Sequence, residues 1–176
     1  MTADGWPTLD KQAYYGPLGA FVLDAQEHTE ADPAAILVSG LVAVGALIGR
    51  KPHAWAGDAR HGVNLDAVIV GESSKARKGT SWAVNGNVLE VLDESFAATR
   101  VMSGFGSGEK LVDELAAEAG DKRLLVVETE FSRVLRVCAR DGSVLSQIIR
   151  DAWDGRPLQI RSRSKTSIAT EHHVAV

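Results

Sequence analysis

The sequence predicts an α/β fold in which a mostly parallel sheet is flanked by helices and preceded by a helical N-terminal extension. Two short apolar runs, LDAVIV at 65–70 and RLLVV at 123–127, are typical of strands buried on both faces of a parallel sheet. Stretches of helical character separate the strand candidates, and this alternation is typical of parallel sheets with right-handed crossovers. The chain has 176 residues, which suits one compact domain.

Residues 1–50 are predicted to form the helical N-terminal extension. One helix is expected over 18–27 and a second over 33–48, where Asp32 is a candidate N-cap and Pro33 stands in the first turn. The second helix contains the apolar run AAILVSGLVAVGALIG. This run is shorter than the roughly 18 to 20 residues that a membrane span requires, so it predicts a buried helix and no membrane partner.

Residues 51–176 are predicted to form the α/β core. Two short strands are expected around the turn Gly57-Asp58, and they lead into the strand at 65–70. The later elements follow in order along the chain: a helix over 80–97, a strand over 99–103, a helix over 109–119, a strand over 123–127, helices over 132–139 and 143–153, and a hairpin over 158–176.

Composition restricts the class of protein. The formal net charge is −4, so any contact with nucleic acid must come from a local basic patch. Cys138 is the single cysteine, which excludes an internal disulfide and a zinc site built on several cysteines. The N-terminus MTADGWPTLD lacks the basic start and apolar core of a signal peptide. These features predict a cytoplasmic protein.

A glycine-rich basic loop, GESSKARKGTS, joins the strand at 65–70 to the next helix. In a phosphate-binding loop, backbone N–H groups and a lysine contact the phosphates and a hydroxyl holds Mg²⁺. The usual spacing G-x-x-x-x-G-K-[ST] fits only with one extra residue, which makes Lys78 the phosphate lysine and Thr80 or Ser81 the Mg²⁺ ligand. A solvated basic turn is the alternative. The predicted nucleotide-binding residues are Gly71, Glu72, Ser73, Ser74, Lys75, Ala76, Arg77, Lys78, Gly79, Thr80 and Ser81.

Four segments strengthen this prediction: HTEADPAAILVSGLVAVGALIGR, VGESSKARKGTSW, SGFGSGEKLVDEL and RLLVVETEFSRVLRVCARDGSVLSQIIRDAWDG. In this order they resemble a family of uncharacterised P-loop proteins of actinobacteria, phages and plasmids. These proteins are associated with bifunctional DNA primase/polymerase modules. The resemblance implies a RecA-like, helicase-type ATPase core that uses ATP and Mg²⁺ and acts on DNA, single-stranded in the full-length protein. It also implies a hexamer for full-length relatives and a core that is incomplete at the C-terminus.

Acidic residues follow two of the predicted strands. P-loop ATPases need one carboxylate near Mg²⁺ and one that orients the attacking water. Glu128 and Glu130 follow RLLVV and would point to the same side of an extended strand, so both are candidates for Mg²⁺ and Glu130 also for catalysis. Glu109 is the second candidate for the catalytic acid. The structural alternatives are helix-capping acids after RLLVV and a first-turn acid behind an N-cap at Ser107.

A basic stretch near the C-terminus is a candidate contact for DNA phosphates or for a neighbouring subunit. It comprises Arg156, Arg161, Arg163 and Lys165. The alternative is a solvated hairpin edge, where basic side chains discourage edge-to-edge pairing.

The tryptophans and the paired histidines are predicted to be structural. Trp55, Trp82 and Trp153 are expected to pack against the fold rather than to stack on bases. His172 and His173 have no metal-ligand spacing.

The sequence therefore predicts a Mg²⁺-dependent ATPase domain of a DNA replication or mobile-element primase–helicase protein, in which Lys78 neutralises the γ-phosphate. The alternative is a non-catalytic nucleotide- or DNA-binding module with a degenerate loop. A small-molecule kinase is weaker, because no lid-like arginine cluster is visible.

Overall fold

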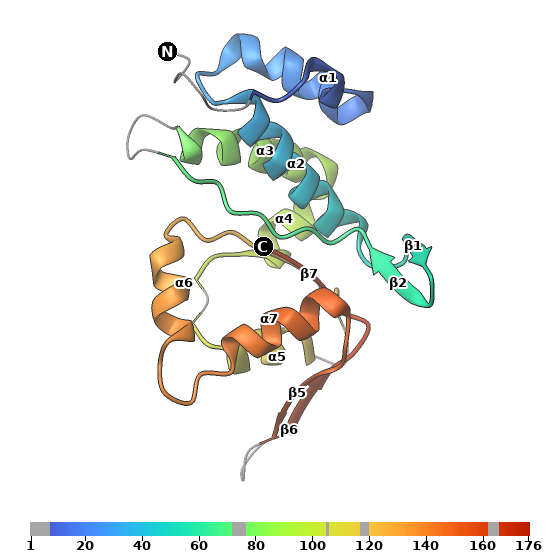
Figure 1. Cartoon of the computed structure of the whole chain (residues 1–176), viewed down its shortest axis with the longest axis vertical. Coiled ribbons are helices and arrows are strands. Elements are labelled where there is room, and N and C mark those ends of the chain that lie inside the picture. The colour runs from blue at the N-terminus through green and yellow to red at the C-terminus, as the bar shows by residue number, and fades with distance from the viewer. Residues whose placement is uncertain (1–7, 72–76, 105, 117–119, 162–165) are drawn as a thin grey trace.

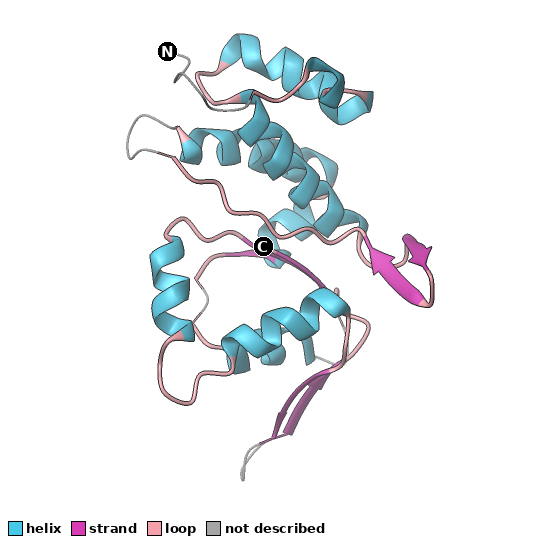
Figure 2. Ribbon diagram, viewed as in Figure 1, coloured by secondary structure: helices cyan, strands magenta, loops and turns pink. Residues whose placement is uncertain are grey.

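The computed structural model describes residues 8–71, 77–104, 106–116, 120–161 and 166–176. Helices lie on both sides of a small set of central strands (Figure 1). Figure 2 shows that most of the remaining strand structure lies in two hairpins at the periphery. The mixed α/β class with a parallel sheet, which the sequence predicts, is confirmed.

The N-terminal helices form as predicted. Helix α1 covers Gly16–Ala25 and helix α2 covers Pro33–Ile48. Short 3₁₀ turns precede and follow α1, at Lys11–Ala13 and Gln26–His28. The N-cap of α2 is Asp32, whose carboxylate accepts hydrogen bonds from the first-turn N–H groups, the shorter at 2.8 Å. Within the described ranges, no helix is long and apolar enough to cross a membrane.

The two predicted strands after α2 form a hairpin. Strands β1 (His53–Ala56) and β2 (Ala59–Gly62) pair antiparallel around a turn at Gly57, whose positive φ of 60° suits glycine. The hairpin projects from the body of the molecule (Figure 1).

The segment 65–70 differs from the prediction. It is extended, but it is not a strand. In the described part of the chain, its backbone contact is a single hydrogen bond from Ala67 N to Val176 O at 2.8 Å, supplemented by Val176 N, which donates to the Asp66 carboxylate at 3.1 Å. Val68 and Val70 remain 57% and 88% exposed. The apolar run therefore borders the sheet instead of lying buried inside it.

The helix predicted over 80–97 is two helices. Helix α3 covers Lys78–Leu92 and helix α4 covers Glu94–Arg100. Asp93 separates them because its carboxylate accepts a hydrogen bond from Phe96 N at 2.9 Å and thereby caps α4. An aspartate can compete in this way with the helical backbone, which is why it breaks a helical pattern that contains no glycine or proline at that point.

A three-stranded parallel sheet forms the centre of the molecule, in the order β3-β4-β7. Its strands cover Val101–Met102, Arg123–Val126 and His173–Ala175. Strand β7 lies between β4 and the extended segment, because Ala67 hydrogen-bonds to the residue that follows it. Segment 65–70 and β7 run in the same direction (Figure 1).

The remaining elements surround the other side of the sheet. Helices α5, α6 and α7 cover Gly108–Ala116, Phe131–Cys138 and Leu145–Asp154. Strands β5 (Leu158–Arg161) and β6 (Thr166–Ala169) form the predicted C-terminal hairpin. The hairpin does not extend to the end of the chain, because β7 leaves it and joins β4.

The alternation of side chains in β4 explains why the sheet has a core on each face. Leu124 and Val126 pack against α5, α6 and α7, whereas Leu125 packs against α2, α3 and α4. Helix α2, which the sequence assigns to an N-terminal extension, thus covers one face of the sheet directly. A third cluster joins α1 to α2 around Val22 and Ile36.

Candidate functional site

Lys78 closes the predicted phosphate loop. It is the first residue of α3, and its Nζ donates a hydrogen bond to the carbonyl oxygen of Gly71 at 2.6 Å. The ammonium group of Lys78 is therefore fixed beside Gly71, the last described residue before the loop. Five of the predicted nucleotide-binding residues lie outside the described residues: Glu72, Ser73, Ser74, Lys75 and Ala76.

Arg77 adopts the left-handed backbone conformation, with φ 45° and ψ 32°. Residues with a β-carbon rarely take this conformation, and glycine takes it readily. In the alignment with one extra residue, Arg77 occupies the place of the glycine that precedes the lysine. Its guanidinium forms an ion pair with Glu30 at 2.6 Å, but both side chains are exposed, so this pair adds little to stability.

The first turn of α3 carries backbone N–H donors and one exposed side-chain hydroxyl. Thr80 is exposed, whereas Ser81 is buried and its Oγ donates to Lys78 O at 2.7 Å. The side chain of Arg77, the N-cap residue, does not hydrogen-bond to the first-turn N–H groups. Among the described residues, a β-carbon at Gly79 would meet no atom within 4 Å, and Gly79 is exposed. Of the two candidate Mg²⁺ ligands, Thr80 is the one directed outward.

Glu128 and Glu130 follow β4 at the same edge of the sheet. Val127 N donates to Met102 O at 2.9 Å, so the loops that follow β3 and β4 lie side by side. Strand β4 ends at Val126, so the same-side argument that holds on an extended strand does not apply to the two acids. Glu128 is half-buried and Glu130 is exposed.

Glu130 is partly engaged by its own helix. It occupies the N-cap position of α6 and accepts a hydrogen bond from Ser132 Oγ at 3.2 Å. The guanidinium of Arg136 lies 3.9 Å from the same carboxylate oxygen. These contacts correspond to the predicted alternative of a helix-terminal acid, although the carboxylate bonds to a side chain rather than to backbone N–H groups.

Glu109 lies in the first turn of α5, at the carboxyl end of β3. Ser107 Oγ accepts a hydrogen bond from Lys110 N at 3.2 Å, so it caps this helix as the structural alternative expects. Glu109 itself is exposed. A small cavity at this place is lined by Met102, Gly104, Gly106, Ser107, Lys110, Leu111 and Val126.

Two basic residues at this edge do not follow from the motifs in the sequence. Lys110 lines the small cavity, and the guanidinium of Arg133 would lie 3.6 Å from a β-carbon placed at Gly104. The sequence indicates only that Arg133 and Arg136 share one side of a helix. That this side reaches the loop after β3 depends on the packing of α6, which the local pattern does not specify.

The segment that leads to Gly71 and the strand that precedes the acids are not neighbours. Strand β7 separates the segment before Gly71 from β4, which carries Glu128 and Glu130. Within the described ranges, no group of three or more His, Cys, Asp or Glu side chains could hold a metal ion. Mg²⁺ does not require such a cluster, because it binds through one or two protein oxygens together with phosphates and water. The exposed Thr80 hydroxyl fits that requirement.

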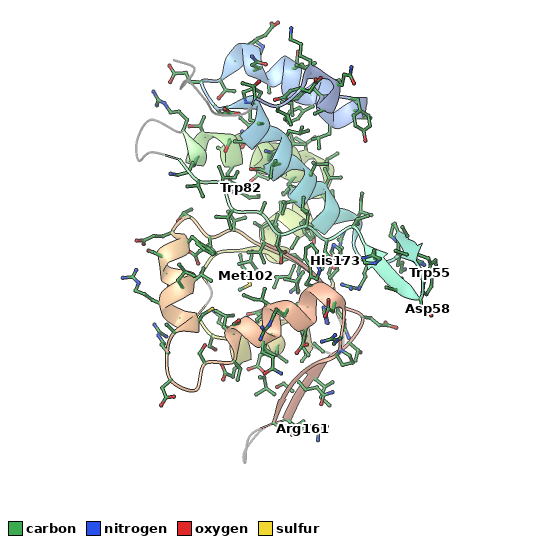
Figure 3. All side chains as sticks on the ribbon, in the orientation of Figure 1. Trp55, Asp58, Trp82, Met102, Arg161 and His173 are labelled. Carbon is green, nitrogen blue, oxygen red and sulfur yellow. The ribbon has the colours of Figure 1, made fainter. Side chains whose placement is uncertain are left out.

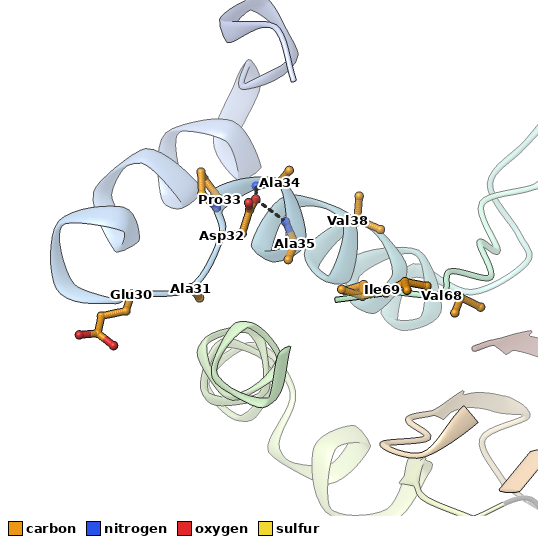
Figure 4. Close-up of a pocket in the computed structure, with 10 residues that line it drawn as sticks. Glu30, Ala31, Asp32, Pro33, Ala34, Ala35, Val38, Val68 and Ile69 are labelled. Carbon is orange, nitrogen blue, oxygen red and sulfur yellow. Dashed lines mark hydrogen bonds between the residues drawn. The ribbon is translucent and has the colours of Figure 1, made fainter. Parts of the chain in front are cut away.

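A second cavity of about 640 Å³ lies beside Val70, the residue that precedes Gly71. Its walls come from the N-terminal turn of α2 and from the extended segment (Figure 4). Its lining residues are Glu30, Ala31, Asp32, Pro33, Ala34, Ala35, Val38, Val68, Ile69 and Val70. Apart from Glu30 and Asp32, these residues are apolar.

The candidate basic patch near the C-terminus is only partly described. Arg156 forms ion pairs with Asp151 at 3.4 Å and with Asp154 at 3.1 Å, so its charge is already compensated. Arg161 ends β5 and donates to Gln159 Oε1 at 3.1 Å. Arg163 and Lys165 lie outside the described residues.

Comparison with known proteins adds no family to these observations. No family model matches the chain, no curated protein matches it, and no solved structure matches it.

Proposed function

We propose that this chain binds ATP with Mg²⁺ in the loop between Gly71 and α3, as the nucleotide-binding part of a RecA-like ATPase domain. The observation that carries the proposal is the 2.6 Å hydrogen bond from Lys78 Nζ to Gly71 O at the N-terminus of α3. A lysine at the start of a long helix that follows a glycine-containing segment is typical of phosphate-binding sites. The parallel sheet with helices on both faces supports the same proposal, because ligands of such sheets bind beyond the carboxyl ends of the strands.

The candidate site residues that the structure describes then have the following roles. Lys78 neutralises the γ-phosphate after exchanging its bond to Gly71 for one to a phosphate oxygen. The first-turn N–H groups of α3 donate to the phosphates, and Thr80 supplies a hydroxyl to Mg²⁺. Glu128 holds a water of the metal, and Glu109 or Glu130 orients the attacking water. Such catalysis is electrostatic and positional, because phosphoryl transfer leaves little covalent chemistry to the protein.

The resemblance in the sequence supports a wider proposal. The domain acts in the cytoplasm on DNA, beside a primase/polymerase module, and full-length relatives assemble as hexamers. In RecA-like motors a neighbouring subunit completes the site, which would supply groups that this chain places at a distance.

A non-catalytic nucleotide-binding module is the second candidate. The observations in its favour are that β7 separates the loop from the acids and that Ser132 and Arg136 engage Glu130. In such a module, ATP binds at Lys78 but no carboxylate positions water for attack.

Calorimetric titration of ATP, with and without Mg²⁺, tests the proposal. The wild-type chain should bind ATP, and Mg²⁺ should strengthen the binding. Lys78→Ala should abolish it, because the phosphates lose their lysine. Lys11→Ala is the matched control, since Lys11 is an exposed lysine in the N-terminal 3₁₀ turn.

Three outcomes are decisive. Binding that survives Lys78→Ala contradicts the assigned loop, and a folded wild type that binds no ATP contradicts nucleotide binding altogether. Binding by the wild type without release of phosphate in a parallel hydrolysis assay supports the non-catalytic module over the ATPase.

A further inference from the structure

The β1–β2 hairpin presents an exposed aromatic side chain that neither the core nor the nucleotide loop explains. Trp55 keeps 63% of its surface exposed, whereas the sequence predicts that it packs against the fold. Every residue of β1 is exposed, as is every residue of β2 except Gly62. Figure 3 shows Trp55 and Asp58 on the hairpin where it projects from the body of the molecule. An exposed tryptophan is a large apolar surface that binding can bury.

The indole ring is held in place on the hairpin. The ring of His53 contacts it edge to face, with the ring centres 5.6 Å apart and the planes at 80°. His53 is fixed in turn, because its Nδ1 lies 2.7 Å from Lys51 O and donates to it. A ring that is already oriented loses little conformational entropy when a partner stacks on it.

A basic side chain shares the face of Trp55, and a second lies just before β1 in the chain. Arg60 stands directly opposite Trp55 in the antiparallel register, so the two side chains lie on the same face of the ribbon. The guanidinium of Arg60 donates to Arg50 O at 3.0 Å, which keeps it over the base of the hairpin. Lys51 adds a second exposed cation. Asp58, in the turn, is the single acidic residue between positions 50 and 62. The patch is basic although the chain as a whole carries −4.

We infer that the β1–β2 hairpin binds single-stranded nucleic acid, with a base stacked on Trp55 and the phosphates beside Lys51 and Arg60. An oriented aromatic ring flanked by cations is the combination that binds unpaired strands without sequence preference. A duplex is less suited, because its bases are stacked on one another and offer no free face to the indole. The inference does not depend on ATP binding, since the hairpin contains none of the residues proposed to bind ATP.

Fluorescence anisotropy with a labelled oligothymidine of about 16 nucleotides, at the upper end of the site sizes of single-strand-binding folds, tests the inference. The full chain is titrated without nucleotide, so the result is separate from the ATP assay. Trp55→Ala should weaken binding about tenfold, and Trp55→Phe should retain most of it because phenylalanine still stacks. Lys51→Gln should make the logarithmic dependence of affinity on salt less steep by about 0.7.

Tyr15→Ala is the matched control, because Tyr15 is 83% exposed and lies before α1, away from the hairpin. It should bind the oligonucleotide as the wild type does. Equal binding by the wild type and Trp55→Ala, or no binding by the wild type, overturns the inference. So does self-association of the wild type that Trp55→Ala abolishes in sedimentation velocity, because the occupant would then be a second copy of this chain.

Discussion

At the scale of single residues, His173 is the described group whose pKa is shifted most from its ordinary value. It lies on β7, 1% exposed, and its Nε2 donates to Gly45 O at 2.9 Å. Its Nδ1 has no hydrogen-bond partner among the described residues. Burial therefore lowers the pKa of the imidazole to about 4, and the nearby charge of Arg50 adds to the effect. His173 is therefore neutral in the folded protein at neutral pH.

This pKa predicts how stability depends on pH. The unfolded histidine binds a proton near its ordinary pKa of about 6.5, whereas the folded one does so only near 4, so the unfolded state binds more protons between these values. The contribution of His173 is intact above pH ~6.5 and is lost as the pH falls toward ~4, by about 3 kcal/mol in total. Urea unfolding at several pH values measures this slope.

His173→Gln is the comparison variant for that measurement, because its amide can still donate to Gly45 O but does not titrate. Its free energy of unfolding should change less between pH ~6.5 and ~4 than that of the wild type. Identical slopes in the two proteins would mean that His173 is not the titrating group.

At the scale of the elements, a close approach between α2 and the chain after the β1–β2 hairpin requires a glycine. A β-carbon on Gly45 would lie 2.3 Å from the carbonyl oxygen of Val63, a separation that real β-carbons do not show. The same glycine accepts the hydrogen bond of His173. Helix α2 can thus lie against both the sheet and the chain at Val63 because position 45 has no side chain.

Gly45→Ala should therefore destabilise the protein by about 1–3 kcal/mol, because overpacking outweighs the higher helix propensity of alanine. Gly86→Ala in α3 is the matched control. The nearest atom to a β-carbon there is in Trp82 at 4.0 Å, so it should raise stability by up to about 1 kcal/mol. Thermal unfolding of both variants compares them, and equal effects would contradict the close approach.

The elements differ in how far the sequence predicts them. Helix α2 was predictable because Asp32 and Pro33 mark its start and an uninterrupted apolar run follows. The break at Asp93 was not, because it depends on one side chain that competes for a backbone N–H group. The run at 65–70 has the composition of a buried strand, yet burial depends on partners on both sides, and the described chain provides them on one side only.

At the scale of the whole molecule, contacts between residues far apart in the chain determine where the candidate site residues lie. The sequence predicts Lys78 in a loop shortly before a helix and acids after the strand at 123–127; the helix begins at Lys78 itself, and the acids follow β4. It does not predict that β7 separates them, because that arrangement joins residues far apart in the chain: Asp66 contacts Val176 across 110 positions. The pairing of Trp55 with Arg60 on one exposed face likewise required the register of the hairpin.

The layered arrangement also predicts which backbone amides are protected from hydrogen exchange. Leu124, Leu125 and Val126 lie in the central strand with cores on both faces, so their amides should exchange slowest. Peptides covering the β1–β2 hairpin and Val68–Val70 should exchange fastest, because these segments are exposed and lightly bonded. Mass spectrometry of exchanged peptides measures both, and protection of the hairpin equal to that of β4 would contradict the description.

The place of β7 in the sheet determines when the domain can close during translation. A ribosome adds about 5–20 residues per second, so segment 65–70 waits several seconds for the residues that border it. Until β7 emerges, the faces of α2 and β4 that meet Ala175 have no cover. The earlier elements can pack on one another in that interval, but the sheet is complete only when residues 173–176 have left the exit tunnel.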